Sequence, residues 1–201
     1  MCEYCGCQDL VSIGELTREH DAVVAEIAGV RAFLRDHDVD GAAKAARRIA
    51  EILGPHTAVE ERGLFPLMRQ EFPEHIEALE REHRVIEDVL AEAGDGTPTD
   101  PSWPTRLLSA LELLRDHILK EQDGVFPAAL SVLDTEGWEL VEAVRARAGS
   151  AVGHDGPARG WDEGATHTHV HDSHHSHDSH DSYDSHHRPP MVTAPEQEDH
   201  A

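Results

Sequence analysis

Apolar residues recur at alternating steps of three and four along four segments between residues 12 and 131. This spacing gives a helix one apolar face, which is typical of helices that pack against one another. The expected inward positions, segment by segment, are Ile13, Leu16, His20, Val23, Ile27, Val30 and Leu34; Ala45, Ile49, Ile52 and His56; Ile76, Leu79, His83, Ile86 and Leu90; and Leu107, Ala110, Leu114, His117 and Glu121. Each predicted helix therefore carries one histidine on its apolar face.

Turn-forming residues separate the four segments. Breaks are expected near residues 38–41, at Phe72-Pro73 and across the Gly- and Pro-containing stretch 94–104. The pattern predicts an all-α, up-down-up-down four-helix bundle. A shorter helical segment at about 136–148 follows the fourth helix and is expected to cover one end of the bundle.

The amino-acid composition is consistent with one helical domain and argues against nucleic acid and membranes as partners. The aliphatic residues dominate, aromatic residues make up only 4%, and 201 residues suffice for a single core. With 40 acidic against 17 basic residues, the formal charge of -23 opposes binding to nucleic acid or anionic membranes. Since no apolar leader or membrane-spanning stretch is evident, we expect a cytoplasmic protein.

Both ends of the chain differ from the predicted bundle. We expect a cysteine-containing segment at 1–11, the bundle at 12–149 and a disordered His-, Asp- and Ser-rich tail at 150–201. Cys2, Cys5 and Cys7 are expected to be reduced. They are exposed thiols, part of a metal site completed by a histidine, or thiols that donate electrons or sense oxidants. The tail holds 11 of the 17 histidines, so it is expected to bind Ni, Zn or Cu weakly or to act as a pH-sensitive solubility segment.

An internal repeat organises the bundle into two related halves. Arg-Glu-His at 18–20 recurs at 81–83, and HTAVEERGLFP at 56–66 recurs as HILKEQDGVFP at 117–127. Each half is expected to form one helical hairpin, with one isolated histidine and one HxxxE motif. The two hairpins would pack into a pseudo-symmetric bundle.

The two HxxxE motifs suggest metal ligation. Glu60 and Glu121 each follow an inward histidine by four residues, which places carboxylate and imidazole on one helix face. At about 1.5 Å rise per residue, the four histidines lie at one depth to within roughly a turn. Unpaired, such buried groups would cost several kcal/mol each, so we expect bound cations. Imidazole and carboxylate donors suit iron, manganese or zinc, and two half-sites suggest two ions bridged by the glutamates.

The order H, HxxxE, H, HxxxE, with Leu-Phe-Pro and Val-Phe-Pro after the two HxxxE motifs, resembles the hemerythrin-like HHE cation-binding family over about residues 12–131. The resemblance implies two non-haem Fe ions, with positions left for an oxo or hydroxo bridge and for a small diatomic or peroxide ligand such as O2 or NO. The implied metal ligands are His20, His56, Glu60, His83, His117 and Glu121.

The sequence departs from the oxygen-carrying hemerythrins, in which the third helix carries two histidines one turn apart and the last carboxylate is an aspartate. Here Leu79 and Glu87 flank His83 by one turn, and the last carboxylate is Glu121. Changed donors alter redox behaviour, so we expect sensing, detoxification or iron handling, including weak peroxide- or NO-consuming activity, rather than bulk O2 transport. The redox partner is not indicated.

Two other functions compete with this interpretation. One is metal storage or delivery, in which the His-rich tail and the cysteines hold Ni, Zn or Cu. The other is a ferritin-like carboxylate oxidase, which requires paired ExxH motifs. Only Glu80-x-x-His83 fits the ExxH pattern, which argues against it. Among further candidates, His37 and His75 are expected at the surface, while Glu61 and Glu87 are possible supplementary carboxylates.

The segment after each HxxxE motif carries a proline that a continuous α-helix does not accommodate. Pro66 and Pro127 lack an amide proton and clash with the carbonyl four residues earlier. We therefore expect the helix to kink or restart beside Gly63 and Gly124. The neighbouring apolar residues either seal the site from water or serve packing alone; these are Leu64, Phe65, Val125 and Phe126.

Overall fold

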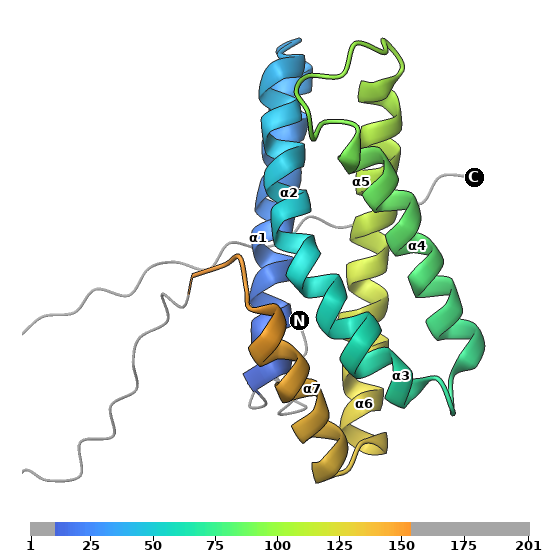
Figure 1. The fold of residues 1–201 in the computed structure, drawn as a ribbon. Coiled ribbons are helices and arrows are strands. Elements are labelled where there is room, and N and C mark those ends of the chain that lie inside the picture. Colours follow the sequence, from blue (N-terminus) through green and yellow to red (C-terminus); the bar gives the residue numbers. More distant parts are fainter. Residues whose placement is uncertain (1–10, 154–201) are drawn as a thin grey trace, which may run out of the picture. The chain divides into compact units, whose positions relative to one another are not determined.

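The computed structural model describes residues 11–153 and shows helices, with no strand in that range. The bounds in chain order are α1 Val11–Arg35, α2 Val39–Val59, η2 Glu60–Leu64, α3 Phe65–Met68, α4 Pro73–Ala91, α5 Trp103–Lys120, η3 Glu121–Val125, α6 Phe126–Val132 and α7 Thr135–Ala148, where η marks a π-helical turn. The long helices α1, α2, α4 and α5 run up-down-up-down (Figure 1). The predicted all-α bundle is confirmed. None of the described helices is long and apolar enough to cross a membrane.

The first hairpin joins α1 to α2 through a tight turn. His37 adopts a positive φ of 58°, and the backbone N–H of Gly41 donates to Oδ1 of Asp38 at 2.8 Å. This cap satisfies an N–H of the first turn, which otherwise has no partner inside the helix. As a result α2 begins at Val39, inside the break that the sequence predicted at 38–41.

The second hairpin joins α4 to α5 through residues 92–102, the upper loop in Figure 1. The indole Nε1 of Trp103 donates to the Val89 carbonyl oxygen at 3.2 Å, and the guanidinium of Arg47 on α2 donates to the Ala93 carbonyl oxygen at 2.7 Å. Pro104 lies in the first turn of α5, where its missing N–H costs no helical hydrogen bond. These contacts fix the loop against both hairpins.

A layer of polar side chains divides the core into two apolar clusters. The upper cluster includes Val23, Ile49, Ile86 and Leu114, and the lower cluster includes Ile13, Leu16, Leu64 and Phe65. The inward positions predicted from the sequence are buried, with two exceptions: Leu34 and Ile52 are only partly buried. In α2 it is Leu53, one residue after Ile52, that is buried.

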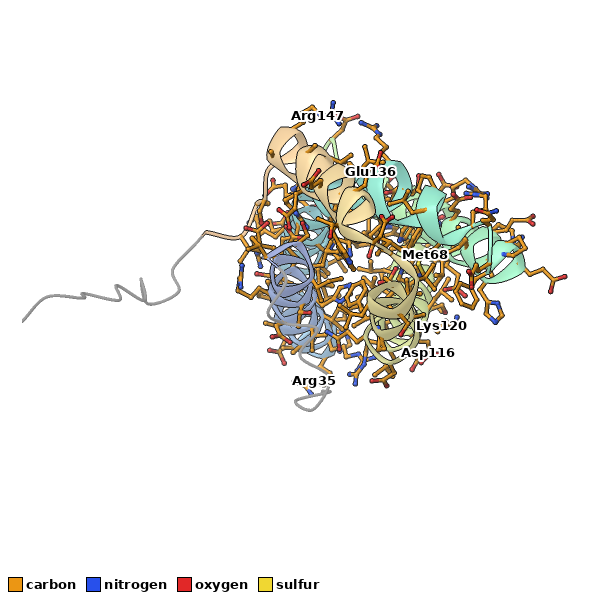
Figure 2. All side chains as sticks on the ribbon, turned by 90° about the horizontal axis from the view of Figure 1, so that it is seen from below. Arg35, Met68, Asp116, Lys120, Glu136 and Arg147 are labelled. Atoms are coloured by element: carbon orange, nitrogen blue, oxygen red, sulfur yellow. The ribbon has the colours of Figure 1, made fainter. Side chains whose placement is uncertain are left out.

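The extra helix α7 packs along the outside of the first hairpin, against α1, α2 and η2. Figure 2 shows the bundle from below, with Glu136 and Arg147 labelled on this helix. Val141 and Val144 join the lower apolar cluster. A Cβ on Gly63 would lie 3.4 Å from the Cβ of Val144, at ordinary van der Waals distance, so α7 packs directly against η2 at this glycine. The extra helix thus covers a side of the bundle near its lower end.

Candidate metal centre

Each HxxxE motif spans the junction between an α-helix and a π-helical turn. The N–H of Phe65 donates to the carbonyl oxygen of Glu60, five residues earlier, and Phe126 bonds to Glu121 in the same way. Pro66 and Pro127 follow directly, in the first turn of the short helices α3 and α6, which begin at Phe65 and Phe126. The predicted restart of each helix is confirmed, although the sequence did not reveal its π geometry. Such turns are frequent at functional sites.

The six predicted ligands converge at the centre of the bundle, and all of them are buried. Oε2 of Glu60 lies 3.4 Å from Nε2 of His56 and 3.4 Å from Nε2 of His83. Glu121 lies between the other two histidines, with Oε1 at 2.9 Å from Nε2 of His117 and Oε2 at 3.2 Å from Nε2 of His20. Each glutamate therefore lies between one histidine of each hairpin.

The donor atoms form two overlapping groups that share both glutamates. One group is His20, His56, Glu60 and Glu121, and the other is His83, His117, Glu60 and Glu121; within each, the ligand atoms lie within 4.8 Å of one another. Among the described residues, the carboxylate oxygens of both glutamates and Nε2 of His83 and His117 make no hydrogen bond. Buried polar atoms without partners are costly, and cations would satisfy them. This donor set fits two bridged cations.

Three of the histidines are held from behind by carboxylates. Nδ1 of His56 donates to Glu19 at 3.0 Å, and Nδ1 of His117 donates to Glu82 at 2.9 Å. With the proton on Nδ1, the imidazole presents a free Nε2 lone pair to the centre. Neither glutamate was predicted from the sequence as a supporting residue. Their signal was the repeated Arg-Glu-His, in which each glutamate directly precedes an inward histidine.

Glu61, considered as a supplementary ligand, has this supporting position too. Its Oε1 accepts a hydrogen bond from Nδ1 of His83 at 3.0 Å, so this contact lies on the ring nitrogen that faces away from the shared glutamates. The repeat places Gln122 at the equivalent position of the second half. Nδ1 of His20 has no hydrogen-bond partner within residues 11–153. The two half-sites therefore differ outside the ligands themselves.

A second difference lies in the cations that contact the supporting glutamates. The guanidinium of Arg145 on α7 donates to both oxygens of Glu19, at 2.9 and 3.0 Å, and both residues are buried. The Ser150 hydroxyl donates to the same carboxylate at 2.6 Å. Glu82 instead pairs with exposed Lys120. The Arg145 contact joins residues 126 positions apart, and α7 has no counterpart in the repeat, so no sequence pattern indicated it.

The charges in the cluster shift the pKa values of its members. Burial alone would lower the pKa of His56, but the charge of Glu60 and the hydrogen bond to Glu19 outweigh it and raise the pKa to about 10. The pKa of His83 rises to about 9, since Glu60 outweighs burial there too. Burial would raise the pKa of Glu60, yet the charge of His56 holds it well below its usual range. Protons therefore supply the positive charge that cations would provide.

Two phenylalanines cover the centre. The ring of Phe65 stacks on His83 with centroids 5.7 Å apart, and Phe126 stacks on His20 at 5.8 Å. Both phenylalanines are buried in the lower apolar cluster. The sealing and packing interpretations of these residues are therefore compatible, because the rings that pack the lower core also cover the imidazoles.

The remaining candidates lie away from the donor groups. His37 and His75 are exposed, as expected. Glu80, the acidic residue of the ferritin-like ExxH pattern, pairs with Arg69. Glu87 is exposed and belongs to neither donor group. The cysteines and the His-rich tail from His154 onward lie outside the described residues.

Comparison with known proteins agrees with this geometry. The family model of the hemerythrin HHE cation binding domain matches residues 11–129, more than half of the chain. No curated protein and no solved structure gave a significant match. The matched range contains all four long helices and all six converging side chains, and it ends before α7. The chain therefore belongs to the hemerythrin HHE cation-binding domain family.

Proposed function

We propose that the bundle holds two non-haem iron ions and interacts with O2, peroxide or NO, in sensing, detoxification or iron handling. The supporting observation is the pair of overlapping donor groups that share Glu60 and Glu121. His20 and His56 would hold one ion, and His83 and His117 the other. Bound iron supplies open coordination positions and one-electron redox chemistry to a small ligand.

The surrounding residues support the ligands in definite ways. Hydrogen bonds from Nδ1 to Glu19, Glu61 and Glu82 fix three imidazoles with Nε2 toward the centre. Phe65 and Phe126 exclude water from the lower side. The donors are nitrogen and oxygen, with no thiolate among the described ligand groups, which suits iron better than copper(I).

The distribution of donors argues against bulk O2 transport. Each group contains two imidazoles and the same two carboxylates. Leu79 packs in the lower cluster and Glu87 is exposed, so neither position adds a donor one turn from His83. The two ions would thus have equal protein ligation, unlike the arrangement expected of the oxygen-carrying hemerythrins.

Iron reconstitution of the full chain tests this proposal. Because the histidine-rich tail can bind metal by itself, the informative quantity is the difference between the wild type and a site variant. We expect about two more irons per chain in the wild type than in Glu121→Gln or His56→Ala, with visible absorption of a ferric pair in air. His75→Ala, which removes an exposed histidine, is the matched control and should retain both irons. Equal iron content in the wild type and Glu121→Gln would contradict the proposal.

A role in metal storage or delivery remains a second proposal, because 11 of the 17 histidines lie between His154 and His200. It concerns residues outside the described range. Nickel, zinc and copper titrations of the full chain and of a chain ending at Gly153 test it. Storage predicts a large loss of capacity on truncation, and unchanged capacity would contradict it.

A further inference from the structure

A small cavity adjoins the metal centre on the side away from the stacked phenylalanines. Its volume is about 10 Å³, and all four ligand histidines line it, whereas Glu60 and Glu121 do not. A space of this size holds roughly one water molecule. Phe65 and Phe126 lie on two of the imidazoles and belong to the lower cluster, while the cavity is bounded by Leu53, Ile86 and Leu114 of the upper cluster. The cavity is therefore the space available to a ligand beside the imidazoles.

Glu87 marks where this cavity meets solvent. It is the one exposed residue among those that line the cavity, and it lies on α4, one turn after His83. No ion pair or hydrogen bond of its side chain occurs within residues 11–153. Apart from the histidines, it is the only lining residue with an ionisable side chain. The carboxylate of Glu87 thus lies at the solvent-facing opening of the cavity.

Thr57 supplies a polar group to the wall. It lies on α2 directly after His56 and is 7% exposed. In contrast to Thr17, whose hydroxyl donates to the Ile13 carbonyl oxygen at 2.9 Å, the Thr57 hydroxyl makes no hydrogen bond to any described residue. Its oxygen is not fully shielded from solvent, so the hydroxyl is free to donate a hydrogen bond to an occupant of the cavity that carries an acceptor atom.

The repeat shows that this pair of polar residues occurs on one side only. The counterpart of Thr57 in the second half is Ile118, and the counterpart of Glu87 in the first half is Val24. Both cavity-lining residues come from α2 and α4, whereas α5 and α1 carry apolar residues at the matching positions. The cavity therefore has one hydroxyl, from Thr57, and one carboxylate, from Glu87, and neither is repeated in the other half of the bundle.

We propose that this cavity is the ligand site, entered between α2 and α4, and that it selects neutral small molecules with a hydrogen-bond acceptor, such as NO, O2 or H2O2, over anions. Thr57 donates a hydrogen bond to the bound molecule. Glu87 repels anions at the mouth and leaves neutral molecules unaffected. The inference rests on the proposed function, since the ligand is held beside the metal ions.

Association rates test the role of Glu87. Azide is the anionic probe and NO the neutral one, each mixed rapidly with iron-loaded full-length protein. Glu87→Gln should raise the azide association rate roughly three- to tenfold at low ionic strength, with a smaller gain at high salt, and should change the NO rate less than about twofold. Glu87→Lys should accelerate azide further. The matched control is Asp88→Asn, an exposed neighbour that does not line the cavity. Equal azide rates in Glu87→Gln and the wild type would overturn the selection of neutral ligands.

Dissociation rates test the role of Thr57. Thr57→Val is nearly isosteric and removes the donor, so NO should dissociate roughly three- to tenfold faster, as the loss of one hydrogen bond predicts. Thr57→Ser keeps the donor and should restore the rate to within about twofold. Ile118→Val, at the matching repeat position, should have no effect. An unchanged NO dissociation rate in Thr57→Val would contradict the assigned hydrogen bond.

Metal content separates this inference from the proposed function. If the variants hold two irons and their ligand kinetics match those of the wild type, the cavity assignment fails while the di-iron proposal stands. If the wild type takes up no iron, the di-iron proposal fails. Azide binding to cobalt(II)-loaded protein then decides the cavity assignment: Glu87→Gln must still bind azide faster than the wild type.

Discussion

At the scale of single residues, the centre depends on side chains that contact the ligands from behind. Glu19 and Glu82 each accept a proton from Nδ1 of an HxxxE histidine, and this choice of tautomer leaves Nε2 for a cation. Both glutamates belong to the repeated Arg-Glu-His motif. Each copy of the motif therefore supplies a glutamate that supports one histidine and a histidine that is itself a predicted ligand. The two glutamates differ in their own surroundings, which makes Glu82, on the more exposed side, the better position to test.

We expect Glu82→Gln to weaken metal binding about 10- to 100-fold, because the amide is a poorer acceptor for Nδ1 of His117. The free energy of unfolding of the metal-free protein should change little, since Glu82 is only half-buried and solvent can reach Lys120. Competition with a coloured chelator measures the affinity. Glu77→Gln, an exposed glutamate on the same helix, is the control, and equal affinities for the two variants would contradict the supporting role.

The metal-free protein should lose stability as pH rises from 6.5 to 10. The pKa values of His56 and His83 rise to about 10 and about 9, so their contribution is complete below the unfolded value near 6.5 and is lost as pH passes through the folded values. The lowered pKa of Glu60 acts oppositely: its contribution is present above about 4.5 and is lost as pH falls.

Urea denaturation at pH 6 and pH 9 checks the sign. The metal-free protein should have the larger free energy of unfolding at pH 6. The metal-loaded protein should gain relative to it at pH 9, because a cation displaces protons from the imidazoles and binds more tightly when they are absent. Greater stability of the metal-free protein at pH 9 than at pH 6 would contradict this prediction.

At the scale of elements, α7 contacts the half of the metal centre that contains His56, through one buried arginine and one buried glutamate. Arg145 brings a buried guanidinium to Glu19, and Glu19 in turn holds His56. Nε of the same guanidinium lies 3.2 Å from Oε2 of Glu15, so one arginine contacts two carboxylates of α1. This helix lies beyond the range that the family model matches. Its contact with the centre therefore lies outside the matched range.

Arg145→Met should lower the free energy of unfolding by about 3–5 kcal/mol, because it removes the guanidinium that pairs with both oxygens of the buried Glu19 carboxylate and leaves His56 as the remaining positive charge beside it. The double variant Glu19→Gln/Arg145→Met should be less destabilised than the single one, since neither charge then remains alone. Arg147→Ala, on the exposed face of the same helix, should change stability by less than about 0.5 kcal/mol. Denaturant unfolding of the metal-free proteins measures all three.

The two π-helical turns have the same sequence pattern but different neighbours. A Cβ on Gly63 would meet Val144 and Val141 of α7, whereas a Cβ on Gly124 would meet nothing within 4 Å. Gly63→Val should therefore destabilise the protein by about 1–3 kcal/mol through overpacking, and Gly124→Val should cost clearly less. Thermal unfolding of the two variants checks this. Equal losses of stability in the two variants would show that the destabilisation comes from the changed backbone preference rather than from the contact with α7.

At the scale of the whole molecule, the fold and the six converging side chains could be predicted mainly from patterns within short stretches of sequence. The steps of three and four identified the buried faces, and the repeat identified six convergent side chains, because both depend on residues close in sequence. Leu53 rather than Ile52 is buried, and periodicity alone could not decide between them, because steps of four and three connect Ile49 to His56 through either residue. Arg145 and the asymmetric cavity depend on contacts between distant segments, so they became visible only with the fold.

The polar layer between the two apolar clusters has a consequence for how the bundle comes apart. Without cations, the upper and lower clusters are separated by a layer of polar groups, several of which lack a hydrogen-bond partner among the described residues, so we expect each cluster to open as its own cooperative unit. Bound ions would bridge all four long helices and merge the two units into one. Amide hydrogen exchange should then show two protection classes in the metal-free protein and a single class after loading. A single class in both states would mean that apolar packing alone couples the halves.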